Sequence, residues 1–136
     1  MSIKYLYKAG EYLHAKETDD DLIKFLNWDN GNFNPVKTSW CAKFVGAVIH
    51  ACGGIDTKSN LARSYLKWGK PVEWRDVRSG DIVILKRGVL PWQGHVGIFN
   101  AWTLKGDPIL LGGNQDDTVK YKAYPLKKVL GYRREI

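Results

Sequence analysis

The chain has no apolar run long enough to cross a bilayer, and it has few of the residues that cross-link small folds or bind metal ions. Its 136 residues include two cysteines and three histidines. No apolar stretch approaches the roughly 20 residues of a membrane-spanning helix. The segment 1–6 also lacks the apolar core of a signal peptide. We therefore expect a protein made in the cytoplasm without a signal peptide, which another machine must deliver if its substrate lies outside.

The scarcity of cysteine argues against a disulfide framework. Cys41 and Cys52 are eleven residues apart on one expected helix. At a rise of 1.5 Å per residue they stand about 16 Å apart, too far for a disulfide. Free thiols indicate a reducing compartment for folding. The cysteines and histidines do not fall at zinc-site spacing, and residues 19–21 lack the spacing of a calcium loop, so we expect no metal and no cofactor.

What the chain does contain fits one globular domain over residues 1–136. Apolar residues make up 44% of the sequence, with six Trp, seven Tyr and four Phe. The formal charge is +7, and the excess lies in residues 61–136, which hold fourteen Lys and Arg against seven Asp and Glu. Such a field attracts polyanions, either nucleic acid or an anionic cell envelope, or serves only solubility. No nucleic-acid recognition motif accompanies it.

The apolar pattern predicts helices first and strands second. The expected helices are one after residues 18–21 that ends near residues 27–28, one capped by Thr38 or Ser39 and stopped at residues 53–54, and a shorter one from residue 59 or 60 to 68. The expected strands are 81–85, 95–102, 108–111, 119–121 and 129–133. This order predicts an α+β fold with an antiparallel sheet.

Three residues have the chain order of a papain-like catalytic site: a cysteine, a histidine and a polar orienting group. Cys41 begins the second expected helix, where backbone N–H groups favour a thiolate and can stabilise an oxyanion. His95 begins a strand, and Asn114 ends the next one. A turn at residues 105–106 would place Asn114 opposite Gly97 and so bring it close to His95.

Each signal alone also has a structural interpretation. An isolated cysteine is more often a core residue, and an isolated histidine more often fills a structural role. Asn114 lies beside two glycines and can be a turn former. Gln115, Asp116 and Asp117 therefore compete with it as the partner of His95.

Five segments together resemble a branch of CHAP-related proteins of phages and bacteria, in the clan that includes the NlpC-type cell-wall peptidases. The segments are Ser39-Trp40-Cys41-Ala42-Lys43-Phe44-Val45, residues 62–69, Gly80-Asp81-Ile82-Val83, Gly94-His95-Val96-Gly97 and Gly112-Gly113-Asn114-Gln115. They occur in order over roughly residues 10–134. The resemblance implies a papain-like fold, with N-terminal helices packed on the sheet, and cleavage of amide bonds in peptidoglycan. It assigns the nucleophile to Cys41 and the base to His95.

The chain departs from these relatives at two positions. Gly112 stands where many CHAP domains have the glutamate that partners the histidine, and Trp40 stands where NlpC-type enzymes commonly have aspartate. Asn114, or its neighbours Gln115 and Asp116, must then orient His95. The expected substrate contacts are Trp40, Trp92 and Gln115. Asp81 is predicted to be a turn and cap residue, and the pair at 86–87 a solvated turn.

The resulting hypothesis is a monomeric peptidoglycan hydrolase, an N-acetylmuramoyl-L-alanine amidase or a peptide endopeptidase. A phage endolysin acting on the host wall after release is favoured. The alternatives are an exported antibacterial effector with an immunity protein as partner, and a non-catalytic wall-binding or virion module of the same fold.

Overall fold

The computed structural model describes residues 2–136 and shows an α+β fold built on one six-stranded antiparallel sheet. The strands lie in the order β1-β6-β2-β3-β4-β5. Their bounds are β1 Lys70–Val72, β2 Ile82–Lys86, β3 Gly94–Trp102, β4 Pro108–Gln115, β5 Thr118–Ala123 and β6 Val129–Arg134. All five expected strands are present, and the predicted α+β class with an antiparallel sheet is confirmed.

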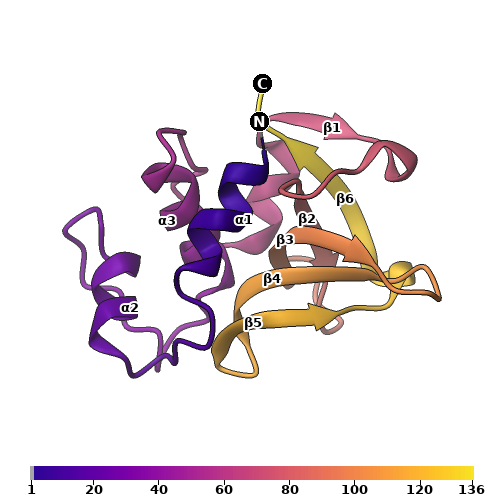
Figure 1. The fold of residues 1–136 in the computed structure, drawn as a ribbon. Coiled ribbons are helices and arrows are strands. Elements are labelled where there is room, and N and C mark those ends of the chain that lie inside the picture. Colours follow the sequence, from indigo (N-terminus) through magenta and orange to yellow (C-terminus); the bar gives the residue numbers. More distant parts are fainter. Residues whose placement is uncertain (1) are drawn as a thin grey trace.

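The three α-helices precede the sheet in the chain and gather on one side of it (Figure 1). The α-helices are α1 Ile3–Gly10, α2 Asp20–Leu26 and α3 Cys41–Ala51, and the 3₁₀ helices are η1 Ala62–Lys67, η2 Trp74–Asp76 and η3 Leu126–Lys128. Both α1 and α3 pack on β3 and β4, whereas α2 packs on α3. The third expected helix is thus a 3₁₀ helix, and the sequence did not predict α1 or β1.

Helix α3 is the most deeply buried helix, because eight of its eleven residues are apolar or small and fully packed. Its N-cap residue is Trp40, whose side chain makes no capping hydrogen bond. The prediction that Thr38 or Ser39 caps this helix is therefore wrong. The backbone N–H groups of Cys41 and Ala42 interact instead with the Cys41 thiol, which occupies the place of a capping oxygen.

The sheet separates two apolar layers through the alternation of side chains along its strands. Ile82 and Ile84 of β2 face the helices and join the larger core, while Val83 and Leu85 face away and join the smaller one. On β3, Val96 belongs to the helical side. By the same alternation, His95 points to the opposite side.

The β3–β4 hairpin has the predicted turn but a different register. Gly106, at the turn, has a φ of 88°, which glycine adopts without strain. Ile98 pairs with Leu111, and the register shifts between Phe99 and Ala101. Trp102 already pairs with Pro108, one residue away from the predicted register, and the β-bulge shifts the pairing by one more, so that Gly112 lies beside Gly97. The predicted pairing of residue 114 with Gly97 is wrong.

A buried ion pair joins the start of β2 to the end of β6. Both guanidinium contacts of Arg134 to the Asp81 carboxylate are 2.7 Å long, and the carboxylate also accepts the backbone N–H of Arg78 at 2.8 Å. Asp81 is fully buried and sits in the turn before β2, as its predicted role as a turn and cap residue requires.

We expect Asp81→Asn to lower the free energy of unfolding by about 3–5 kcal/mol, because it leaves the Arg134 charge without its partner. Urea unfolding at pH 7 measures the change. The control is Asp116→Asn, which breaks exposed ion pairs with Lys120 and Lys122 and should cost less than about 1 kcal/mol. Equal losses in the two variants would contradict a stabilising role for the buried pair.

Candidate active site

Cys41 lies at the first residue of α3 and borders a cavity of about 320 Å³. Its side chain is only 3% exposed. The remaining lining residues come from the segment before α3, from the start of η1 and from the β2–β3 loop: Ser39, Asn60, Leu61, Ala62, Arg87, Trp92, Gln93 and Gly94. The thiol of the predicted nucleophile is therefore exposed to a cavity, but only over a small part of its surface.

Burial raises the pKa of the Cys41 thiol above its usual value. Backbone N–H groups of Val96, Ala42 and Cys41 lower the pKa, as the sequence predicted for a helix start, but they do not outweigh the loss of solvation. The thiol is consequently protonated at neutral pH. The hydrogen bond with Val96 also places Cys41 against the residue that directly follows His95.

His95 is held on the other side of the sheet by two polar side chains. Its Nε2 lies 2.9 Å from Oε1 of Gln115 and 3.1 Å from the hydroxyl of Tyr124. The imidazole and the Tyr124 ring are also in contact, with centroids 5.0 Å apart. Within residues 2–136 no hydrogen bond joins the Cys41 thiol to His95.

The amide of Gln115 determines which ring nitrogen of His95 carries the proton. Its Nε2 donates to the backbone carbonyls of Leu110 and Lys120, at 3.2 and 2.6 Å. The amide oxygen must therefore face His95, and it accepts a hydrogen bond from the N–H at Nε2 of the imidazole. Nδ1 is then the unprotonated nitrogen, which is the state a general base requires.

Burial lowers the pKa of His95 to about 4, with smaller lowering contributions from the positive charges of Arg87 and Lys122 and an opposing one from the Gln115 hydrogen bond. The imidazole is neutral at pH 7. Since the thiol is neutral as well, the pair does not form a thiolate–imidazolium ion pair in the free protein.

This shift predicts a loss of stability in mild acid. His95 takes up a proton near pH 6.5 in the unfolded chain but only at about pH 4 in the folded protein. The free energy of unfolding therefore falls by on the order of 2–3 kcal/mol as the pH drops through this window. Below the window, His95 changes it no further. Urea unfolding between pH 4 and 7 should show a shallower slope for His95→Gln than for the wild type. Equal slopes in His95→Gln and in the wild type would contradict this origin of the acid sensitivity.

Asn114 does not contact His95. Its backbone has a φ of 58°, and its side-chain amide donates to the Ser39 hydroxyl at 2.9 Å. The left-handed conformation at 114 turns its side chain toward the segment before α3 and brings Gln115, which follows it, onto the face of His95. Of the alternatives that the sequence left open, the structure brings Gln115 and not Asn114 to the histidine.

Gly112 is explained by the same arrangement. A Cβ atom at this position would stand 2.6 Å from Oε1 of Gln115, so a side chain at 112 and the observed Gln115 conformation exclude each other. The amide of Gln115 fills the space that a side chain at 112 would need. Gln115 is only 1% exposed and is held by His95 and two backbone carbonyls, so its expected substrate contact stays a prediction.

The two tryptophans expected to contact substrate have different surroundings. Trp40 is fully buried, packs edge-on against Phe44 and fills the space beside Gly113, so it is a core residue and the prediction for it is wrong. Trp92 is 57% exposed and lines the Cys41 cavity, where a substrate contact requires it.

His95 borders a second cavity, of about 430 Å³, on the outer face of the sheet. Besides His95 and Gln115 it is lined mainly by charged and polar residues, among them Lys86, Arg87, Asn114, Asp116, Asp117, Lys122, Tyr124 and Lys128. Arg87 is the one residue common to this cavity and to that of Cys41. The sequence predicted a solvated turn for the pair that includes Arg87, and no motif marks Tyr124.

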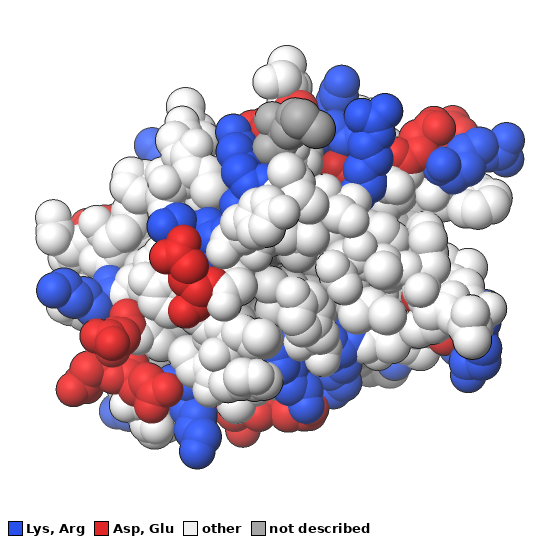
Figure 2. All heavy atoms as spheres, viewed as in Figure 1, with Lys and Arg blue, Asp and Glu red and all other residues white. Residues whose placement is uncertain are grey.

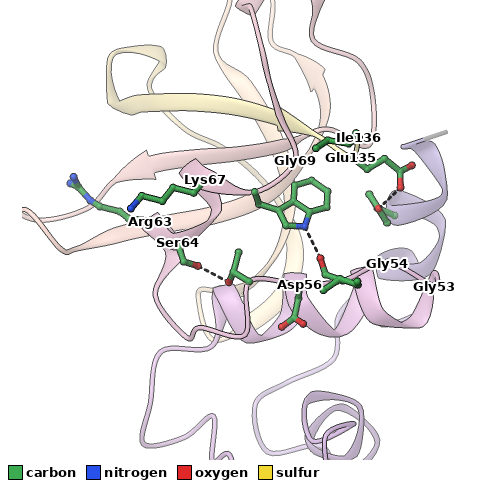
Figure 3. Close-up of a pocket in the computed structure, with 13 residues that line it drawn as sticks. Gly53, Gly54, Asp56, Arg63, Ser64, Lys67, Gly69, Glu135 and Ile136 are labelled. Atoms are coloured by element: carbon green, nitrogen blue, oxygen red, sulfur yellow. Dashed lines mark hydrogen bonds between the residues drawn. The ribbon is translucent and has the colours of Figure 1, made fainter.

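The largest cavity, about 970 Å³, lies elsewhere, between η1, the end of α3 and the C-terminal segment (Figure 3). Trp68 lines this cavity, and its indole N–H donates to the Ile55 carbonyl at 2.8 Å. Arg63 and Lys67 extend away from this ring. The cavity contains no cysteine or histidine, so its size does not connect it with the nucleophile.

Other site classes find no support in the described part of the chain. Residues 2–136 contain no group of three metal-ligating side chains and no helix long and apolar enough to cross a membrane. On the face shown in Figure 2, lysines and arginines are scattered among neutral side chains and form no continuous stripe. No protein-family model matches the chain, and no curated protein matches it.

Proposed function

We propose that this protein is a cysteine-dependent peptidoglycan hydrolase, cleaving either the bond between the glycan lactyl group and the stem peptide or an amide bond within the peptide. The observation that carries the proposal is the arrangement at the start of α3. There the Cys41 thiol borders a cavity and lies against the backbone of Val96, beside a neutral histidine whose tautomer Gln115 fixes. A papain-like fold is part of the proposal, supported by a helix that begins with the cysteine and packs on the antiparallel sheet that holds the histidine.

The proposed chemistry is acyl transfer. The step requires the His95 ring, which makes no hydrogen bond to Cys41 in the free protein, to reach the thiol when substrate occupies the Cys41 cavity. Nδ1 then accepts the thiol proton while sulfur attacks the carbonyl carbon of the scissile amide. The backbone N–H groups at the start of α3 stabilise the oxyanion. The amine leaves with the proton from His95, and water then cleaves the thioester by the reverse sequence. The neutral ground state requires the proton transfer to occur with substrate bound, when the cavity is closed to solvent.

The test is digestion of purified murein sacculi followed by mass spectrometry of the released fragments. A glycan-linked lactyl group freed of its peptide identifies an amidase, and a new amine within the stem or bridge identifies an endopeptidase. Absence of any fragment beyond a protein-free incubation, from both Gram-positive and Gram-negative sacculi, would contradict the proposal.

A second candidate is a non-catalytic module of the same fold that binds wall fragments. The observation favouring it is the neutral, 3% exposed thiol without a hydrogen bond to His95. Alkylation by iodoacetamide at pH 7 separates the two. A thiol that serves as nucleophile should react in the folded protein through its cavity, whereas a core cysteine should react only after unfolding.

The cellular setting proposed first is that of a phage endolysin acting on the wall of the bacterial host. The resemblance to phage and bacterial CHAP-related sequences supports it, and the excess of cations in residues 61–136 suits an anionic envelope. An exported antibacterial effector has the same chemistry. Holin or tail genes beside the gene would indicate the endolysin, and a gene for an immunity protein would indicate the effector.

A further inference from the structure

Arg87 lies between the two residues assigned to catalysis. It follows β2, at the beginning of the loop that leads to β3, and it lines both the Cys41 cavity and the His95 cavity. Burial is the main influence on the pKa values of Cys41, His95 and Tyr124, and the charge of Arg87 lowers all three as well. The guanidinium is therefore close to the reacting groups from both sides.

No acidic group of the protein neutralises this cation. Within residues 2–136 Arg87 forms no ion pair and no hydrogen bond. Arg87 is exposed, and two carboxylates share the His95 cavity with it: Asp116 is paired with Lys120 and Lys122, and Asp117 forms no ion pair with Arg87. A guanidinium presents planar donors that match a carboxylate, so an unpaired one at the junction of two cavities is suited to an anionic group of the substrate.

Arg63, the other basic residue near Cys41, is held by a contact within the fold. Arg63 donates through Nε to the carbonyl of Gln93 at 2.6 Å and thereby holds the β2–β3 loop. Lys86 lines the His95 cavity but not that of Cys41. Arg87 is thus the cation that lines the Cys41 cavity and can contact a molecule bound at the thiol.

We propose that Arg87 binds a free carboxylate of the substrate next to the scissile amide, and that the enzyme selects wall peptides in which this carboxyl group is not amidated. The inference deepens the proposed function and rests on Cys41 as the reacting residue. It assigns Arg87 as a substrate-binding residue that determines specificity.

Two alkylating reagents that differ only in this feature test the assignment without any wall substrate. Iodoacetate carries a carboxylate where iodoacetamide carries an amide, and both react when the cysteine sulfur displaces iodide and the thiol proton is released. Trypsin cleaves after Lys43 and places Cys41 and Cys52 on separate peptides. Mass spectrometry then gives the iodoacetate-to-iodoacetamide rate ratio for each thiol in the same sample.

We expect Arg87→Gln to lower the ratio at Cys41 about fivefold to tenfold, as the loss of one partly solvated charge-assisted contact predicts, with the ratio at Cys52 unchanged. Arg87→Lys should be intermediate, since it keeps the charge but loses the planar donors. Lys86→Gln, the adjacent cation, should leave the ratio at Cys41 within twofold of the wild type.

An equal ratio in wild type and Arg87→Gln would overturn the proposal, as would a Cys41 that reacts with neither reagent in the folded protein. The first result leaves the proposed hydrolase activity standing, because sacculus digestion is measured separately, whereas the second also favours the non-catalytic module. With muropeptides that carry the free or the amidated carboxyl group, Arg87→Gln should raise KM for the free form and leave KM for the amidated form unchanged.

Discussion

Replacing Cys41 with alanine is expected to lower the rate of sacculus digestion by on the order of 10³-fold or more. Alanine keeps the start of α3 and its apolar contacts but leaves no atom that can form the thioester. The residual rate would come from the oriented backbone N–H groups and from binding alone. The initial loss of turbidity of purified sacculi measures the effect, with protein concentration adjusted to equal folded fractions.

Cys52→Ala is the matched control, because it removes the other free thiol from the opposite end of the same helix. Cys52 makes a single long contact, 3.7 Å, to the carbonyl of Lys4 and borders neither the cysteine nor the histidine cavity. Its digestion rate should stay within about twofold of the wild type. If Cys41→Ala and Cys52→Ala digest sacculi equally fast, the thiol of Cys41 takes no part in the chemistry.

The sequence predicted the class of the fold because helices and strands occupy separate halves of the chain and differ in apolar period. It did not predict α1, although Tyr5, Leu6 and Ala9 recur at helical spacing and are buried. An eight-residue helix with so few apolar positions is stabilised by its packing on α3 and the sheet, which local propensity does not reveal. Strand β1 is similarly short and exists because it pairs with β6.

For the site, the sequence could give residue types and chain order but not burial or register. The start of a helix was predicted to favour the thiolate, and the N–H groups are in place, yet the desolvation of Cys41 is the larger effect. The hairpin was predicted to bring Asn114 near His95. The observed register depends on a bulge between Phe99 and Ala101, which no residue of the turn predicts. One added residue in one strand moves every later side chain to the other face.

The sequence also could not decide which residue contacts His95. Gln115 was among the alternatives, and what selects it is the left-handed backbone at Asn114, Asp116 and Asp117, which makes a tight β4–β5 turn. Two carbonyls, those of Leu110 and Lys120, point at the partner and require a donor. An amide satisfies them and His95 together, whereas a carboxylate has no proton to donate. This accounts for an amide rather than a carboxylate beside His95.

The second large effect is therefore expected at Gln115 rather than at Asn114. Gln115→Ala should lower the digestion rate about 10²-fold, because the imidazole loses the contact that fixes its tautomer and position. Asn114→Gly keeps the positive φ without strain and removes only the bond to Ser39. It should lower the rate by less than about threefold. Initial rates on sacculi at pH 7 compare the two variants.

A purely structural role for Gln115 would produce a different pattern. Two buried carbonyls lose their donor in Gln115→Ala, so its free energy of unfolding should fall by about 1–3 kcal/mol, and rates must be measured well below its melting temperature. If Gln115 orients the base, the loss lies in kcat and persists at saturating substrate, since the cysteine cavity does not include this residue. If the loss instead disappears when the variant is stabilised by lower temperature, or if Asn114→Gly is the more impaired of the two, His95 is not held for catalysis by Gln115.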